Sequence, residues 1–100
     1  MPLHCTFDPS EKRLLISISG DFNFDVNSSF REAYRNIAPV EVAKVSVNLS
    51  QTTYMDSSAL GMLLLLDEHF ENIQISLEQC PDYIQSVLQI ANIDQKFNIS

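Results

Sequence analysis

Apolar residues recur at every second position along three stretches of the chain. Leu14, Ile16 and Ile18 form the first set, and the same alternation returns at 45–49 and 73–77. A period of two predicts β-strands that bury one face. A strand covered on both faces would be almost continuously apolar, so we expect the second face of the sheet to be open to water.

Other stretches have apolar residues at helical spacing. One covers 26–37, with Asp25 as its expected N-cap and Pro39 after it. Another covers 84–91, and Asn92 follows it at a position that suits a left-handed helix end. The pattern therefore predicts helices in both stretches.

The order of elements predicts one α/β domain over residues 1–100. Edge strands are expected at 3–7 and 96–99, and the first two strands should pair antiparallel across a short turn. The units at 42–77 and 72–99 should form right-handed parallel crossovers. The expected architecture is a two-layer fold, a mixed β-sheet with helices packed on one face.

The charge balance narrows the possible functions. The 100 residues include 6 Lys and Arg against 13 Asp and Glu, a formal charge of -7, which disfavours nucleic-acid binding. The longest apolar run, 62–66, is too short for membrane insertion, and 1–10 lacks an apolar stretch of secretory length. We expect a cytoplasmic protein in which Cys5 and Cys80 are reduced and bind no metal.

The candidate chemistry lies in the central segment, 45–63. A strand is expected to end near Leu49, followed by a short polar connection, after which Asp56-Ser57-Ser58 opens a largely apolar helix. Asp and Ser side chains accept hydrogen bonds from the unpaired amides of a first helical turn. Capping alone would explain these residue types, so this reading stays open beside a functional one.

The same residues resemble a known motif. Asp56-Ser57-Ser58, followed by Ala-Leu-Gly and an aliphatic run and preceded by Tyr54-Met55, resembles the phosphorylation loop of STAS-domain anti-sigma-factor antagonists. Residues 88–97 resemble, less specifically, that family's last helix and final strand. The element order is similar over nearly the whole chain. The resemblance implies a STAS-like fold and a single STAS domain.

The resemblance also implies a function in signal transduction and transcription regulation. Ser57 would be the phosphoacceptor, phosphorylated by an anti-sigma factor that acts as a serine kinase and dephosphorylated by a metal-dependent serine phosphatase. Unphosphorylated, the chain would bind the partner regulator and release that regulator's target. The chain departs from the family at Ala59, where Gly is usual, and at Asn23, where a carboxylate is common. The change at position 23 bears on which partner docks.

A helical wheel at roughly 100° per residue divides the central helix. Its buried face comprises Ala59, Leu63, Leu66 and Phe70. Ser57 and Gly61 are neighbours on the opposite face, where the missing side chain should leave a shallow hollow. The residues expected to contact a partner are Asp21, Asn23, Asp56, Ser58, Gly61, Met62, Leu64, Leu65 and Glu68. Leu64 and Leu65 could equally be ordinary surface leucines.

Two other functions compete with this interpretation. As an enzyme, the chain would use Ser57 as a nucleophile, but it has no Gly-x-Ser-x-Gly elbow, and its histidines are His4 and His69, the latter about three turns from Ser57. Without a Gly-rich phosphate loop, kinase activity belongs to the partner; we expect no catalytic residue and no cofactor. The alternative is a STAS subunit of a membrane lipid-transport ABC complex, but such subunits tend to carry Thr or another residue in place of the double serine.

Overall fold

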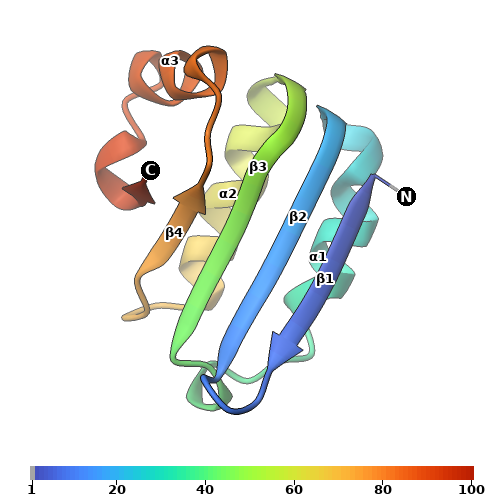
Figure 1. The fold of residues 1–100 in the computed structure, drawn as a ribbon, viewed down its shortest axis with the longest axis vertical. Coiled ribbons are helices and arrows are strands. Elements are labelled where there is room, and N and C mark those ends of the chain that lie inside the picture. Colours follow the sequence, from blue (N-terminus) through green and yellow to red (C-terminus); the bar gives the residue numbers. More distant parts are fainter. Residues whose placement is uncertain (1) are drawn as a thin grey trace.

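A computed structural model describes residues 2–100, so Met1 of the predicted domain lies outside the described residues. A single five-stranded sheet has the order β1-β2-β3-β4-β5 (Figure 1). The strands are β1 (Leu3–Asp8), β2 (Arg13–Phe22), β3 (Lys44–Met55), β4 (Ile75–Glu78) and β5 (Asn98–Ile99). The α-helices are α1 (Asn27–Tyr34), α2 (Ser57–His69) and α3 (Asp82–Ile90), and the short 3-10 helices are η1 (Phe24–Val26), η2 (Pro39–Glu41) and η3 (Asp94–Lys96).

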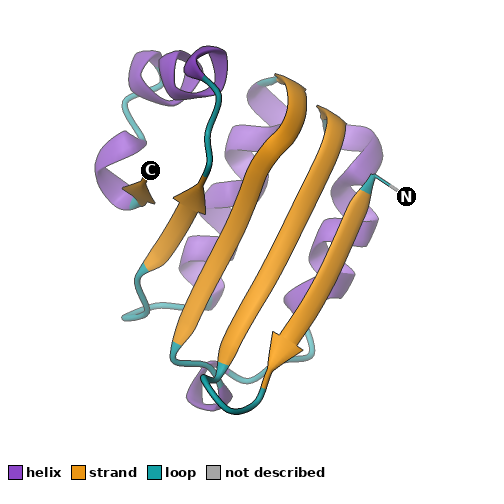
Figure 2. Ribbon diagram, in the orientation of Figure 1, coloured by secondary structure: helices purple, strands orange, loops and turns teal. Residues whose placement is uncertain are grey.

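The pairing of the strands confirms the mixed sheet. Strand β1 runs antiparallel to β2, and β2–β3, β3–β4 and β4–β5 are parallel. Helices α1 and α2 lie side by side behind the sheet in the view of Figure 2, whereas α3 lies beyond the end of β4. The fold is therefore the expected α/β arrangement, with one sheet face covered and the other left uncovered.

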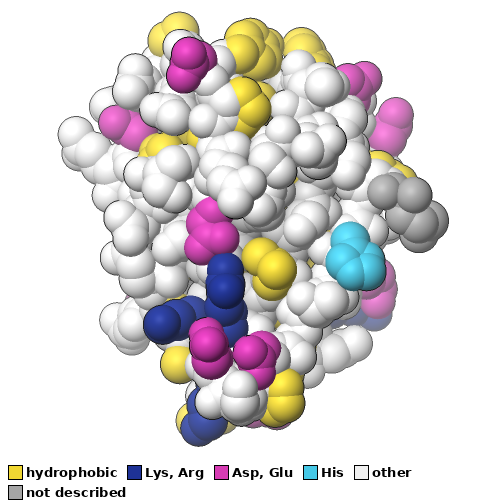
Figure 3. Space-filling model, in the orientation of Figure 1, with side chains coloured by type: hydrophobic (Ala, Val, Ile, Leu, Met, Phe, Trp, Pro, Cys, Tyr) yellow, Lys and Arg dark blue, Asp and Glu magenta, His cyan; other side chains and the backbone are white. Residues whose placement is uncertain are grey.

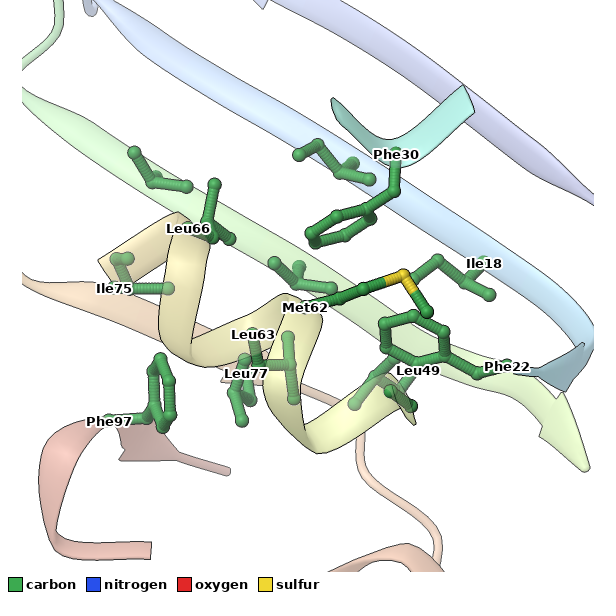
Figure 4. Packing of buried hydrophobic residues seen from close by; sticks show 14 of the residues in the cluster. Ile18, Phe22, Phe30, Leu49, Met62, Leu63, Leu66, Ile75, Leu77 and Phe97 are labelled. Carbon is green, nitrogen blue, oxygen red and sulfur yellow. The ribbon is translucent and has the colours of Figure 1, made fainter. Parts of the chain in front are cut away.

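The core lies between the sheet and the two helices behind it. Leu14, Ile16 and Ile18 of β2 are at most 1% exposed, as their alternation predicts. From α2, Leu63 and Leu66 meet them with no exposed surface (Figure 4). Each fully buried side chain of this size contributes about 1.5–3 kcal/mol, so this packing fixes how α2 is rotated against the sheet.

The start of α1 differs from the sequence prediction. The N-cap role assigned to Asp25 is wrong: the Asn23 side chain accepts a hydrogen bond from the Asp25 backbone N, at 2.9 Å, and begins η1. Helix α1 then starts at Asn27 and ends at Tyr34. The amide oxygen of Asn23 can cap this turn as well as a carboxylate can. At the other end of the chain, the left-handed conformation expected of Asn92 is confirmed, with a φ of 63°.

Strand β3 also departs from the prediction, because it continues to Met55 without the polar connection expected after Leu49. Val45, Ser46 and Val47 are all buried in its first half, and from Leu49 the buried residues recur at every third position, at Leu49, Thr52 and Met55. The pairing with β2 shifts register at two places in the same region. Such bulges break the period of two, which is why the alternation hid the second half of the strand.

Candidate functional site

Helix α2 begins where the two longest strands end. The backbone N of Asp56 donates to the carbonyl oxygen of Phe22, at 3.4 Å, and ties the start of α2 to the end of β2. Oδ1 of Asp56 accepts from the backbone N of Ala59, at 3.1 Å. Asp56 is therefore the N-cap of α2, and the capping role left open by the sequence applies to this residue.

The two serines that follow differ in exposure. Ser57, the first residue of α2, is exposed, and Ser58 is half-buried. Because Asp56 supplies the cap, the hydroxyl of Ser57 is not needed to begin the helix. The structure thus places an accessible hydroxyl at a helix N-terminus, where backbone amides and the helix dipole favour negative charge.

The wheel's prediction for the buried face of α2 is confirmed. Its four members are all 0% exposed: Ala59, Leu63, Leu66 and Phe70. On the opposite face Gly61 and Glu68 are exposed, Leu65 is 51% exposed and Leu64 is half-buried.

Met62 is more buried than the other residues expected to contact a partner. Its side chain is 3% exposed and lies between Ile18 and Phe22 in the core (Figure 4). The wheel places Met62 at the boundary between the two faces, and the wide sheet beneath α2 draws this long, flexible side chain inward. Met62 is therefore mainly a core residue that also lines the hollow described next, and its contact with a partner stays a prediction.

A hollow of about 490 Å³ opens over Gly61. A Cβ built on Gly61 would meet nothing within 4 Å. The lining residues are Phe24, Asn27, Ser58, Gly61, Met62, Leu64, Leu65 and Glu68. The hollow expected from the glycine is thus present, and six members of the predicted contact set come together around it: Ser58, Gly61, Met62, Leu64, Leu65 and Glu68.

Phe24 of η1 is a lining residue that the sequence interpretation missed. Phe24 lies between β2 and α1 and belongs to no periodic pattern. The signal that could have identified it is its position directly after Asn23, where the sequence departs from the family. Asp21 is exposed and Asn23 half-buried at the end of β2, but neither lines the hollow.

Basic and acidic side chains are mixed at the end of the sheet where β2 and β3 begin, and Arg13 and Glu78 form an ion pair there, 3.1 Å apart. Lys12, Arg13 and Lys44 lie at the amino-terminal ends of β2 and β3, where the blue side chains of Figure 3 gather on the uncovered sheet face. Asp21 and Asp56 lie at the opposite, carboxyl ends of these strands. No Lys or Arg of the described residues lines the hollow, but Arg31 and Arg35 line a neighbouring hollow together with Leu65 and Glu68.

His69 and Cys80 do not line the hollow over Gly61 and have structural roles. Nε2 of His69 lies 2.9 Å from the carbonyl oxygen of Ile37, and its ring packs edge-on against Tyr34 and Phe70. Burial raises the pKa of the Cys80 thiol to about 11, which leaves it protonated and weakly nucleophilic. In residues 2–100, no three His, Cys, Asp or Glu side chains are grouped to hold a metal ion.

This chain is similar to several known proteins. A family model described as "Mlab, STAS domain" matches residues 5–99. A STAS-domain containing protein of Pseudomonas aeruginosa (strain UCBPP-PA14) is 45% identical over 91 residues, 89% of each chain. Among solved structures, a sulfate transporter family protein from Wolinella succinogenes superposes with a TM-score of 0.72 at 16% identity, covering 88% of this chain and 76% of that one.

The anti-sigma factor antagonist SpoIIAA is similar in two solved forms. The unphosphorylated form superposes with a TM-score of 0.75 at 17% identity, covering 98% of this chain and 86% of that one. The phosphorylated form, from Bacillus, gives 0.67 at 14% identity, covering 98% and 90%. At these identities the superpositions establish a shared fold. Within the described residues, no helix has the length and apolar content to cross a membrane.

Proposed function

The chain belongs to the STAS-domain family, and we propose that within this family it is a phosphorylation-controlled protein-binding switch of the anti-sigma-factor-antagonist type. With Ser57 unphosphorylated, it binds a partner that is both an anti-sigma factor and a serine kinase, and the partner releases its target. Phosphorylation of Ser57 ends the binding, and a metal-dependent serine phosphatase restores it. The use of ATP by the kinase places this cycle in the cytoplasm.

The observation that carries the proposal is that Asp56 caps α2 while Ser57, the next residue, remains exposed. Asp56 holds the helix start through its bond to the Ala59 amide, and the adjacent Ser57 is exposed. A kinase can therefore reach the Ser57 hydroxyl without opening the helix. The amides of the first turn tolerate the resulting phosphate, so modification need not unfold the domain.

The phosphate acts through charge at a covered surface. It adds about -1.5 to -2 charges at pH 7, next to the Asp56 carboxylate and beside a hollow that no Lys or Arg lines. A partner that covers Ser57 closely would have to bury this charge without a counter-ion from the chain. Burying an unpaired charge costs several kcal/mol, enough to weaken binding by orders of magnitude. No change of fold is required.

The chemistry of phosphoryl transfer is assigned to the partners. The chain has no Gly-rich phosphate loop. His69, the nearer histidine in sequence, is 12 residues from Ser57 along α2, a rise of about 18 Å at 1.5 Å per residue. Its ring is also held by the Ile37 carbonyl. Ser57 is thus proposed as an acceptor and not as a nucleophile of this chain's own catalysis.

A STAS subunit of a membrane lipid-transport ABC complex is a second candidate. The matching family model is described as "Mlab, STAS domain", and a sulfate transporter family protein shares the fold. The Asp56-Ser57-Ser58 triplet favours the switch. Co-purification from native cells separates the two functions: a serine kinase and phosphatase support the first, and transporter ATPase subunits support the second.

The test of the switch is the site of phosphorylation. The serine kinase that co-purifies with the chain is incubated with it and ATP, and the phosphate is located by mass spectrometry. We expect phosphate on Ser57, because Ser57 is exposed and Ser58 is half-buried. Ser57→Ala should abolish incorporation, and the matched variant Ser58→Ala should retain it. Most of the phosphate on Ser58, or none on either residue, would refute the proposal.

A further inference from the structure

Phe24 is an aromatic side chain left in water. It is 68% exposed, more than Phe7, Tyr54 or Tyr83, which are 42%, 46% and 50% exposed. Phe22 and Val26, two residues to either side, are 0% and 4% exposed. An isolated exposed apolar residue is common, but this one stands at the edge of an apolar hollow.

The ring is presented by a fixed piece of backbone. The Asn23 side chain accepts from the Asp25 backbone N, at 2.9 Å, and the Val26 backbone N donates to the Asn23 carbonyl oxygen, at 3.2 Å. These bonds close the single turn of η1. With Phe22 and Val26 anchored in the core on both sides, Phe24 is directed outward in the free protein. A residue already ordered before association loses less conformational entropy on binding.

Phe24 and residues of α2 line one hollow, and we call the part formed by Phe24, Gly61 and Leu65 the seat. Phe24 contributes an aromatic side from η1, and Leu65, 51% exposed, contributes an aliphatic side from α2. Gly61 lines the same hollow one helical turn before Leu65 and leaves space there, since no atom of a neighbouring element lies within 4 Å of a Cβ built on it. The hollow of about 490 Å³ has room for a large apolar side chain.

The seat lies next to the proposed phosphorylation site, although Ser57 itself does not line the hollow. Ser58 lines the hollow, Ser57 precedes it, and Gly61 follows Ser57 by one helical turn. Glu68 lines the hollow farther along α2, and no Lys or Arg side chain does. Arg31 and Arg35 line the neighbouring hollow, but the chain as a whole has a formal charge of -7, so charge complementarity favours an occupant whose apolar residue is flanked by basic ones.

We propose that Phe24 is a specificity-determining residue of this surface. Together with Gly61 and Leu65 it receives one large apolar side chain of the serine kinase, and Lys or Arg residues flank that side chain in the kinase. This inference rests on the proposed function, because the occupant is the same partner that acts on Ser57. It adds the chemistry by which the chain would select that kinase.

The first test is a titration of the co-purified kinase with purified variants. Phe24→Ala and Leu65→Ala should each weaken binding by about tenfold or more, as truncation of a buried interface anchor does. Val40→Ala and Ile90→Ala are the matched controls, because both side chains are 86% exposed and neither lines the hollow; they should change affinity by less than about twofold. Phe24→Leu should recover part of the loss, and added salt should weaken wild-type binding.

Thermal melts accompany each titration, since Phe24→Ala should leave the melting temperature unchanged. Should Phe24→Ala unfold the domain, Gly61→Gln provides the second variant, because it fills the seat without removing a side chain and should also weaken binding. A folded Phe24→Ala or Gly61→Gln variant with wild-type affinity would overturn the inference.

The readout at Ser57 separates this inference from the proposed function. If Phe24→Ala binds and is phosphorylated like the wild type, the inference is wrong and the switch stands. If Ser57 accepts no phosphate, the switch and the kinase as occupant are both wrong. Photo-cross-linking in native cells from p-benzoylphenylalanine at position 27, which also lines the hollow, then tests whether Phe24 selects an apolar segment. The cross-linked partner segment should carry a large apolar residue beside Lys or Arg and be lost with Phe24→Ala. A polar or acidic segment, or one retained with Phe24→Ala, would refute the seat.

Discussion

At the scale of single residues, the start of α2 keeps the cap separate from the candidate phosphoacceptor. The Asp56 carboxylate accepts the Ala59 amide, and Ser57 remains exposed beside it. Both residue types suit an N-cap, so the sequence could not say which one would take that role. Gly61 was more readily interpreted, because four residues of helix place it on the same face as Ser57.

Gly61 allows docking to be separated from folding. Replacing it with Gln adds a side chain where nothing lies within 4 Å of the new Cβ, and Gly is a poor helix former. Gly61→Gln should therefore raise the free energy of unfolding by several tenths of a kcal/mol to about 1 kcal/mol, while it blocks the hollow. A thermal melt and a partner titration measure the two effects. A lower melting temperature would mean that position 61 has a packing role and would count against the open surface.

At the scale of secondary-structure elements, the sequence predicted regular segments well and irregular ones poorly. The alternation at 45–49 gave the first half of β3, but the bulges opposite β2 changed the spacing of its buried residues after Leu49. Phe24 lies in the single turn of η1, which is too short to show a period. Both features were missed for the same reason: their backbone follows neither the two-residue repeat of a strand nor the 3.6-residue repeat of a helix.

The bulged part of β3 offers a direct test of what holds it. Oγ1 of Thr52, which is 3% exposed, donates to the carbonyl oxygen of Ile18, at 2.8 Å. Thr52→Val keeps the side-chain shape but leaves that buried carbonyl without this donor. We expect the free energy of unfolding to fall by about 1–3 kcal/mol, measured by urea denaturation. Thr53→Val, at an exposed neighbouring position, is the control, and equal stability of the two variants would contradict the assigned hydrogen bond.

At the scale of the whole molecule, the fold brings together parts of the chain that no local pattern connects. Strand β2 ends at Phe22 and β3 ends at Met55 as parallel neighbours, so η1 and the start of α2 lie at one end of the sheet. That is how Phe24 comes to line the same hollow as Gly61. The order of elements predicted the sheet, but the contact depended on the true length of β3, which the sequence did not reveal. The sequence therefore predicted the part of the candidate surface that lies on α2 but missed Phe24, the part that lies on η1.

The central claim is that a phosphate on Ser57 controls partner binding. Its most direct test is to titrate the purified kinase, with ADP bound so that no transfer occurs, against the unphosphorylated chain and the chain fully phosphorylated on Ser57. We expect at least about tenfold weaker binding of the phosphorylated form, with an unchanged melting temperature and recovery after phosphatase treatment. Ser57→Ala carried through the same ATP incubation should bind like the unphosphorylated chain. Equal affinity of the kinase for the two forms would contradict the account.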